Sequence, residues 1–281
     1  MEMTEKRREL LQSLRLMDDI LLSKCFENNL ECAELVLRIV LEKPDLQVTN
    51  VNTQVFMTNL LNRSVQLDIL ATDSQGKKYN IEIQRSDSGA APQRARYNSS
   101  MLDASLLPKG DDFSNLPETY VIFITEHDVL KAGRPIYRIE RYIIDTNSNF
   151  GDGSHIIYVN GSWQDDTPLG KLMHDFSCSN PAEMYYSTLA NRISFFKESK
   201  EGVKDMNQAL EKFWQEGRQE GWQQGQQEGR KIGQQEGRLE TMTAIAKSML
   251  LLAKYDIEEI SKISGLSIAE INKLQEQNIK H

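Results

Sequence analysis

Three polar side chains lie on two apolar segments that flank a short turn. Asp68 belongs to "SVQLDILAT", and Glu82 and Gln84 belong to "KYNIEIQR". Two carboxylates with backbone carbonyl oxygens nearby suit Mg²⁺ or Mn²⁺, which take oxygen ligands and keep several waters. Such an ion lowers the pKa of its bound water and stabilises negative charge on a phosphoryl group. These residue types therefore point to metal-assisted chemistry on a phosphate ester.

The turn "DSQG" between the two segments decides which residues face each other. With the turn centred on Gln75, Asp68 lies opposite Glu82, and Ile69 lies opposite Ile81. Side chains alternate between the faces of an antiparallel pair, so this register separates apolar from polar residues. The expected apolar face carries Val65, Leu67, Ile69, Ala71, Tyr79, Ile81 and Ile83, and the other carries Gln66, Asp68, Asn80, Glu82 and Gln84 with Leu70 and Thr72.

Like charges that face each other destabilise a sheet. Asp68 and Glu82 therefore need either a bound cation or one carboxyl group with a raised pKa. A structural alternative stays open at this point, because antiparallel sheets often leave one face in water, where acidic residues are incidental.

The flanking segments indicate the elements that position these residues. Residues 18–43 repeat apolar residues at helical spacing and predict one long helix that ends before Pro44. Three strands, a polar helix and a fourth strand follow, which gives the order α-β-β-β-α-β. The segments are "LQVTNVNTQVF", "SVQLDILAT", "KYNIEIQR", "PQRARYNSSMLDASLL" and "ETYVIFITE"; further strands are expected in "IYRIERYIID" and "HIIYVNGSW", and helices around 166–176 and 182–197.

These motifs resemble the PD-(D/E)XK nuclease superfamily, and within it the Rpn-type recombination-promoting nuclease and transposase family. That family has an Asp at the start of an N-terminal helix, "LD(I/V)" on a strand, a "D-x-x-G" turn, "(I/V)E(I/M)Q" on the next strand and "R-x-x-Y" on the following helix. The resemblance covers roughly residues 15–200. It implies an α/β restriction-endonuclease-like core with extra strands and a helical C-terminal tail. This sequence supplies "DILLSKCF" from Asp19, "LDILATDSQGKKYNIEIQ", and "RARY" with Arg94 and Tyr97.

The resemblance also implies roles for individual residues. Asp68 and Glu82 would bind the divalent metal, Mg²⁺ or Mn²⁺, with the carbonyl of Ile83 as a third ligand. Gln84 stands where the wider superfamily has lysine; its neutral amide can orient a water or a phosphate oxygen but brings no positive charge. The superfamily's proline is also absent, because Leu67 precedes Asp68. Contacts to the DNA backbone would come from Arg85, Arg94, Arg96 and Tyr97, and Asp19 would be either an accessory site residue or only a helix cap.

The bulk composition limits the classes of function. The chain has 281 residues, a net charge of −8 and 39% hydrophobic residues, which is ordinary for a globular protein. The negative charge argues mildly against a general nucleic-acid coat protein, although basic residues between 77 and 96 can form a local positive surface. No apolar run is long enough to span a membrane. Cys25, Cys32 and Cys178 are too few for a disulfide framework, so we expect free thiols and a cytoplasmic protein.

The composition changes sharply after about residue 200. Glycine recurs every four residues from Gly217 to Gly237, and each one costs a helix about 1 kcal/mol relative to alanine. We interpret residues 201–240 as a helix stabilised by self-association; a flexible linker is the alternative. Residues 241–281 predict a helical pair around Gly265, with Ser267 and Glu270 forming a capping box. Residues 1–200 would then be the nuclease-like domain, and the helix-turn-helix-like tail a protein contact rather than a DNA reader.

The leading functional prediction is a metal-dependent DNA endonuclease that hydrolyses phosphodiester bonds. A link to recombination or transposition follows from the family resemblance alone. The competing prediction is a catalytically weak or inactive nuclease-like module that binds or regulates, with the tail assembling a homo-oligomer.

Overall fold

The structure is a computed structural model that describes residues 5–59 and 63–279. It divides into two compact units, Met1–Glu211 and Lys212–His281. Within the described ranges, no helix has both the length and the apolar character needed to cross a bilayer. Cys25 and Cys32 are buried free thiols, and Cys178 is a half-buried one.

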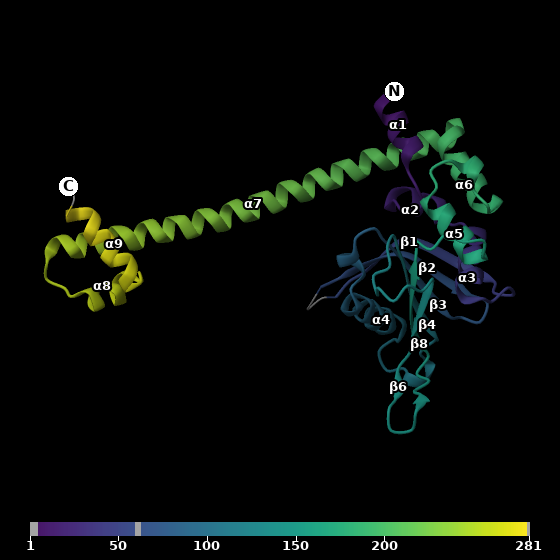
Figure 1. Cartoon of the computed structure of the whole chain (residues 1–281), viewed down its shortest axis with the longest axis horizontal. Helices are drawn as coiled ribbons and strands as arrows, with labels where there is room; N and C mark the ends of the chain where they lie inside the picture. The colour runs from purple at the N-terminus through teal and green to yellow at the C-terminus, as the bar shows by residue number, and fades with distance from the viewer. Residues whose placement is uncertain (1–4, 60–62, 280–281) are drawn as a thin grey trace. The chain divides into compact units, whose positions relative to one another are not determined.

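A six-stranded mixed sheet forms the centre of the first unit (Figure 1). Its strand order is β1-β2-β3-β4-β8-β5. β2 runs antiparallel to β1 and β3, β4 and β8 continue parallel to β3, and β5 returns antiparallel to β8. The strands are β1 Val48–Met57, β2 Val65–Asp73, β3 Lys78–Gln84, β4 Thr119–Thr125, β5 Ile136–Ile139 and β8 Ser154–Asn160, with a separate pair formed by β6 Tyr142–Ile143 and β7 Ser148–Asn149.

Helices cover both faces of this sheet. α2, α3, α5 and α6 pack on one face in the largest apolar cluster, with Ile69, Ile81 and Ile122 among the strand residues. α4 covers the other face, where Ala95 packs with Phe123 and Tyr158. The helices of this unit are α1 Glu5–Ser13, α2 Asp19–Phe26, α3 Leu30–Leu41, α4 Pro92–Leu106, α5 Pro168–Ser177 and α6 Ser187–Glu198, with short 3₁₀ turns η1 Asp87–Ala90, η2 Phe113–Asn115 and η3 Pro181–Glu183.

The order α3-β1-β2-β3-α4-β4 confirms the α-β-β-β-α-β core expected from the sequence. The β2–β3 register is also as expected: Ile69 pairs with Ile81, and Ala71 pairs with Tyr79. One part of the face assignment was wrong. Leu67 packs with Leu102 of α4, together with Val65 and Leu70, rather than in the core under α2 and α3. This part of β2 lies beyond its last pairing with β3, at Ile69, and pairs with β1, where Leu67 lies opposite Val55.

The single long helix predicted over 18–43 was also wrong, because two helices occupy this segment. α2 ends at Phe26, and Asn28 adopts a left-handed φ of 54° that interrupts the helical path. The side chain of Asn29 then accepts a hydrogen bond of 2.9 Å from the N–H of Cys32 and caps α3. Asparagine suits both positions, since its short amide tolerates the left-handed region and caps helices well. The spacing of apolar residues alone does not reveal this break between the two helices.

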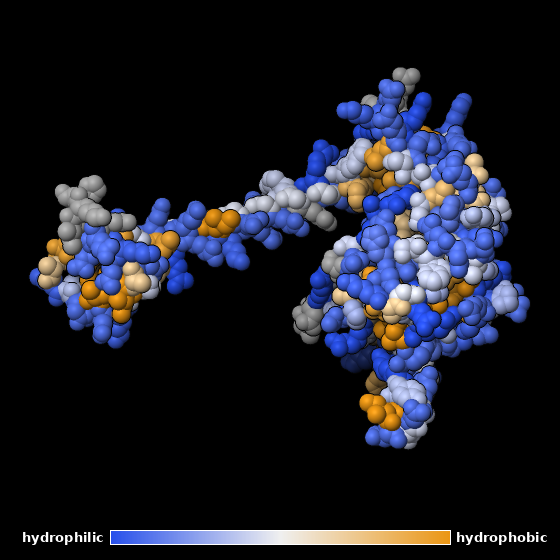
Figure 2. All heavy atoms as spheres, viewed as in Figure 1, coloured by the Kyte–Doolittle hydropathy of each residue, from blue (hydrophilic) through white to orange (hydrophobic). Residues whose placement is uncertain are grey.

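The glycine-rich segment is helical and forms part of α7, Lys200–Leu252. A Cβ added at any glycine from Gly217 to Gly237 meets no atom within 4 Å, so this stretch of α7 is bare on its glycine side. Figure 2 shows that the middle of α7 is mostly hydrophilic. α8 Ile257–Ser264 and α9 Ile268–Ile279 follow, and Gly265 ends α8 with φ 78°. Ser267 and Glu270 form the expected reciprocal capping bonds, at 2.8 and 3.4 Å.

Candidate functional site

A cavity of about 840 Å³ opens where β2 and β3 meet the N-terminal half of α4. Asp68 reaches it from β2, Gln84 from the end of β3, and Asp19 from the start of α2. Arg94 and Tyr97, one turn apart on α4, form another wall. Chain segments that are far apart in sequence thus bring most of the predicted site residues to one place. The other lining residues are Gln54, Arg63, Ser64, Val65, Gln66, Ile83, Arg85, Ala91, Gln93 and Asn98.

Glu82 lies beneath this cavity and is fully buried. Its Oε1 accepts a hydrogen bond of 3.0 Å from the amide of Asn80, and its Oε2 lies 3.4 Å from Nη2 of Arg94. Burial raises the pKa of the Glu82 carboxyl group, and the Asn80 amide, Arg94 and the N–H of Asp68 lower it only in part. The alternative of a solvent-exposed sheet face is therefore wrong at Glu82, because α4 covers the polar face of the β2–β3 hairpin.

Asp68 lies next to Glu82, and the two charges oppose each other. Its Oδ2 accepts a hydrogen bond of 2.9 Å from the N–H of Ile83, which ties β2 to β3 beyond their last ladder pair. Burial, followed by the charge of Glu82, raises the pKa of Asp68 to about 7. The expected conflict between facing carboxylates is therefore present. It is only partly relieved by the surrounding protein.

Arg94 joins two of the motif residues. Besides its ion pair with Glu82, its Nη1 donates to Oε1 of Gln84 at 3.4 Å. Gln84 also lies against Gly89 of η1, where an added Cβ would fall 2.0 Å from the same oxygen. The side-chain amide of Gln84 is therefore held between a glycine and a guanidinium, with its NH₂ group as the remaining donor.

Asp19 lines the cavity and is not the cap of α2. Asp18 occupies the N-cap position, and Asp19 is the first helical residue. Burial, followed by the charge of Asp18, raises the pKa of Asp19, and Asp19 in turn contributes to the raised pKa of Asp68. Three carboxylates thus influence one another at this cavity.

The predicted DNA-contacting residues separate into two groups. Arg94 and Tyr97 face the cavity, and the Tyr97 hydroxyl donates to the carbonyl of Arg63. Arg85 also lines it, but its guanidinium pairs with Asp18 at 2.7 Å and with Glu126 at 3.4 Å. The structure does not bring Arg96 to this cavity. Arg96 follows Arg94 by two residues on α4, which places its side chain about 200° around the helix axis from that of Arg94.

Several lining residues were missed by reasoning from the sequence. Arg63 comes from the connection before β2, and Gln66 donates to Gln54 at 2.6 Å across β1 and β2. Asn98 follows Arg94 by one helical turn and is almost completely buried. An i, i+4 search from Arg94 would have found Asn98, whereas no local pattern marks Arg63.

Comparison with known proteins supports this architecture. Residues 35–162 match the family model described as PD-(D/E)XK nuclease family transposase. This segment, which is somewhat less than half of the chain, is similar to that family. The match confirms the resemblance drawn from the hairpin motif, and it includes Asp68, Glu82, Gln84 and Arg94 but not Asp19. Searches of curated proteins and of solved structures gave no match.

PD-(D/E)XK nucleases generally use divalent metals, so the donor set at this cavity bears on whether such an ion fits. Within residues 5–59 and 63–279, no group of three or more His, Cys, Asp or Glu side chains is arranged to hold a metal. Mg²⁺ does not require one, because it is commonly bound through one or two carboxylates, waters and substrate phosphates. The Asp68 and Glu82 carboxylates and the Ile83 carbonyl are hard oxygen donors. Burial is the first cause of the raised pKa of both acids, and a bound cation would offset the cost of burying their negative charge. The residues therefore fit the ion.

Proposed function

We propose that this protein is a metal-dependent DNA endonuclease that hydrolyses phosphodiester bonds, with Mg²⁺ or Mn²⁺ held by Asp68, Glu82 and the Ile83 carbonyl. The observation that carries the proposal is the pair of mutually repelling carboxylates at one cavity, with the pKa of Asp68 raised to about 7 by burial and by Glu82. The family match over residues 35–162 supports a nuclease. We include in this proposal a role in recombination or transposition. We also propose that the protein works in the reducing cytoplasm, where free thiols persist.

The residues of the cavity have separate tasks in this proposal. When bound, the ion supplies a water of lowered pKa and stabilises negative charge at the phosphoryl centre. Arg94 holds one oxygen of Glu82 and the amide oxygen of Gln84, so the Gln84 NH₂ group is left to orient a water or a phosphate oxygen. Because Gln84 is neutral, Arg94 is the nearest source of positive charge, with Tyr97 beside it to contact the DNA backbone.

The test is cleavage of supercoiled plasmid with and without Mg²⁺ or Mn²⁺. We expect metal-dependent nicking or cleavage that is abolished in Asp68→Asn and Glu82→Gln, which keep side-chain size and remove charge. The matched control is Glu34→Gln, since Glu34 is an acidic residue of α3 that pairs with Arg38 away from the cavity. Equal activity in the two site variants would refute the assignment.

A second candidate is a nuclease-like module that binds or regulates without cutting. The Arg94–Glu82 ion pair favours it, because a guanidinium already neutralises part of the buried charge. Isothermal calorimetry with Mn²⁺ separates the two candidates. The endonuclease must bind the ion at the Asp68–Glu82 pair, and absence of binding would favour the regulatory module.

For the tail, we propose homo-oligomer formation through α7. The bare glycine side of this helix and its exposed Trp222 and Leu239 support a close approach between copies. Glycine at six positions of an exposed helical stretch is costly, so a contact would have to compensate for it. Truncation after Glu211 followed by measurement of the molar mass tests this proposal; an unchanged oligomer would refute it.

A further inference from the structure

Behind the proposed metal site lie two buried asparagines whose hydrogen bonds are incomplete. Asn80 is fully buried on β3, and Asn98 is 1% exposed on α4. Among the described residues, three buried side-chain atoms have no hydrogen-bond partner, and two of them are Oδ1 of Asn80 and Nδ2 of Asn98. One is an acceptor and the other a donor, so each supplies what the other needs.

The path of α4 across the sheet is fixed by two contacts. Near its N-terminus, Arg94 lies 3.4 Å from Glu82. Further along, the carboxylate of Asp103 accepts a hydrogen bond of 3.1 Å from Thr119, which pairs with Lys78 at the start of β3. The helix therefore runs antiparallel to β3, over the face that carries Glu82.

This path brings Asn98 level with Asn80. From Arg94 to Asn98 the helix rises about 6 Å, at about 1.5 Å per residue. From Glu82 back to Asn80 the strand covers about 7 Å, at about 3.3 Å per residue, and both side chains point to the α4 face. The distance along the helix and the distance along the strand are nearly equal. The unpartnered donor of Asn98 and the unpartnered acceptor of Asn80 therefore lie at the same level between helix and sheet.

We propose that Asn98 is a positioning residue that acts on Glu82 through Asn80. Neither unpartnered atom bonds the other directly, so the Asn98 NH₂ group donates through a bridging water to Oδ1 of Asn80. The Asn80 NH₂ group in turn donates to Oε1 of Glu82. This inference rests on the proposed function, because it assigns Glu82 a role in holding the metal.

The physical effect of this relay is to fix the orientation of two groups. A rotated Asn80 amide would present its oxygen to the Glu82 carboxylate and repel it, and a donor at Oδ1 prevents that rotation. Asn80 then holds Oε1 while Arg94 holds Oε2, so the plane of the carboxylate is set from both sides. Partners of this kind behind metal ligands are worth about 10- to 100-fold in metal affinity or activity.

The test is calorimetric titration of the full chain with Mn²⁺ alone, together with plasmid cleavage over a range of Mn²⁺ concentrations. We expect Asn80→Leu and Asn98→Leu each to weaken Mn²⁺ binding by about tenfold, with cleavage recovering at saturating Mn²⁺. The double variant is expected to bind no more weakly than Asn80→Leu, because both changes break the same relay. Ser99→Ala is the matched control, since it removes a partly buried hydrogen bond of α4 to Ser154 that does not involve Glu82.

The outcomes separate this inference from the proposed function. Undiminished Mn²⁺ binding in Asn98→Leu, with binding lost in Glu82→Gln, overturns the relay and leaves the metal site standing. Undiminished binding in Glu82→Gln, or no binding by the unsubstituted chain, overturns the metal site and the relay with it. A purely structural role for Asn98 would lower the melting temperature and leave the Mn²⁺ affinity unchanged, which also overturns the proposal. Should Asn80→Leu fail to fold, Asn98→Leu alone decides the matter.

Discussion

Two polar clusters lie at opposite ends of the same strands, and they differ in how their charges are balanced. The carboxylate cluster (Asp68, Glu82, Gln84 and Arg94) lies at the C-terminal end of β3. The stacked cluster lies where β3 and β4 begin. It consists of Tyr79, Tyr120, His155, Glu118 and Lys77.

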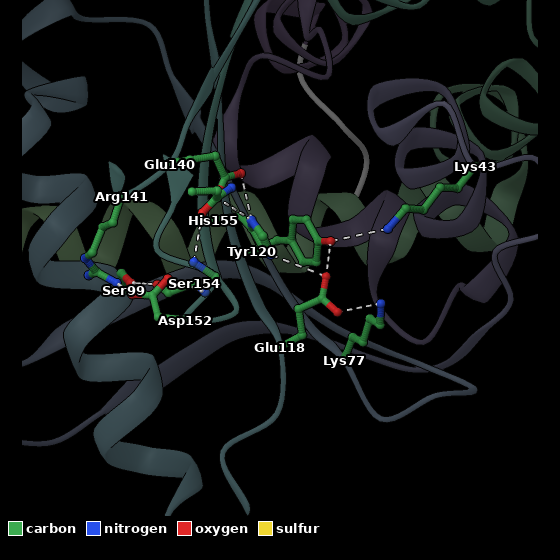
Figure 3. Close-up of polar contacts among 12 residues, drawn as sticks. Lys43, Lys77, Ser99, Glu118, Tyr120, Glu140, Arg141, Asp152, Ser154 and His155 are labelled. Atoms are coloured by element: carbon green, nitrogen blue, oxygen red, sulfur yellow. Dashed lines mark hydrogen bonds and ion pairs between the residues drawn. The ribbon is translucent and has the colours of Figure 1, made fainter. Parts of the chain in front are cut away.

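In the stacked cluster every charge meets an opposite charge or a hydroxyl group. The Tyr120 ring stacks between Tyr79 and His155, with centroids 5.0 and 4.5 Å away. Figure 3 shows Glu118 reaching Lys77, Tyr120 and His155; the Lys77 ammonium lies 2.6 Å away, and the nearest His155 nitrogen lies 3.3 Å away. Burial alone would raise the pKa of Glu118, but the hydrogen bonds from Lys77 and Tyr120 outweigh it, and the pKa is lowered.

The carboxylate cluster has the opposite balance. Arg94 is its one direct cation within the described residues, at 3.4 Å from Glu82, and the pKa values of Asp68 and Glu82 are both raised, chiefly by burial. Paired carboxylates such as Glu118 stabilise a fold, whereas unrelieved ones cost stability and are typical of functional sites. The contrast therefore supports a structural role for one end of the sheet and the proposed metal site at the other.

The largest expected effect on the cleavage rate comes from removing a carboxylate charge in the carboxylate cluster rather than in the stacked cluster. Glu82→Gln should lower plasmid cleavage by about 10³-fold, since removal of a ligand forfeits several kcal/mol of metal-assisted stabilisation. Glu118→Gln removes the same charge from the stacked cluster and should leave the cleavage rate nearly unchanged in folded protein. Comparable losses in both variants, measured as initial rates, would erase the distinction between the clusters.

The cost of the unrelieved charge is measurable in metal-free protein. The pKa of Asp68 is about 7 when folded and 3.8 in the reference state, so its contribution to stability is intact below pH 4 and is lost as pH rises through 7. Asp68→Asn removes this penalty and should raise the free energy of unfolding by a few kcal/mol at pH 8, at about 1.4 kcal/mol per unit of pKa shift. Calorimetric melts at pH 4 and pH 8 check it. Equal effects at the two pH values would contradict the assignment.

Substitution of Arg94, the cation of the carboxylate cluster, is expected to lower the cleavage rate by less. Arg94→Gln removes the ion pair with Glu82 and the bond to Gln84, and should reduce cleavage about tenfold, which corresponds to about 1.4 kcal/mol. Arg96→Gln on the same helix, outside the cavity, is the matched control and should change cleavage little. Rates that fall equally would show that both arginines act through general attraction of DNA.

The smallest effect is expected from the stacked cluster. Glu118→Gln should destabilise the protein by about 1 kcal/mol at pH 7, discounted because the Glu118 side chain is partly exposed to screening. The pKa of Glu118 is lowered on folding, so its contribution is present above the reference value of 4.5 and is lost as the pH falls below it. Melts at pH 7 and pH 3 check the sign. A variant that is more stable at pH 7 would contradict it.

Local patterns in the sequence determined much of this protein. The alternation around Gln75 defined the β2–β3 register, because a one-residue slip exchanges apolar and polar faces. The order of the core elements and the Ser267–Glu270 capping box were likewise readable. Each of these depends on residues that are close in sequence or on a period that short segments repeat.

Only the tertiary structure decided how the polar face is used. The docking of α4 buries Glu82 and brings Arg94, but not Arg96, to the cavity. Ion pairs with Asp18 and Glu126 occupy Arg85, which the sequence shows only as a basic residue near the motif. Desolvation and charge pairing depend on which distant segments cover a side chain, so the chain specifies the carboxylates locally, but their raised pKa values arise only when helix and sheet pack together.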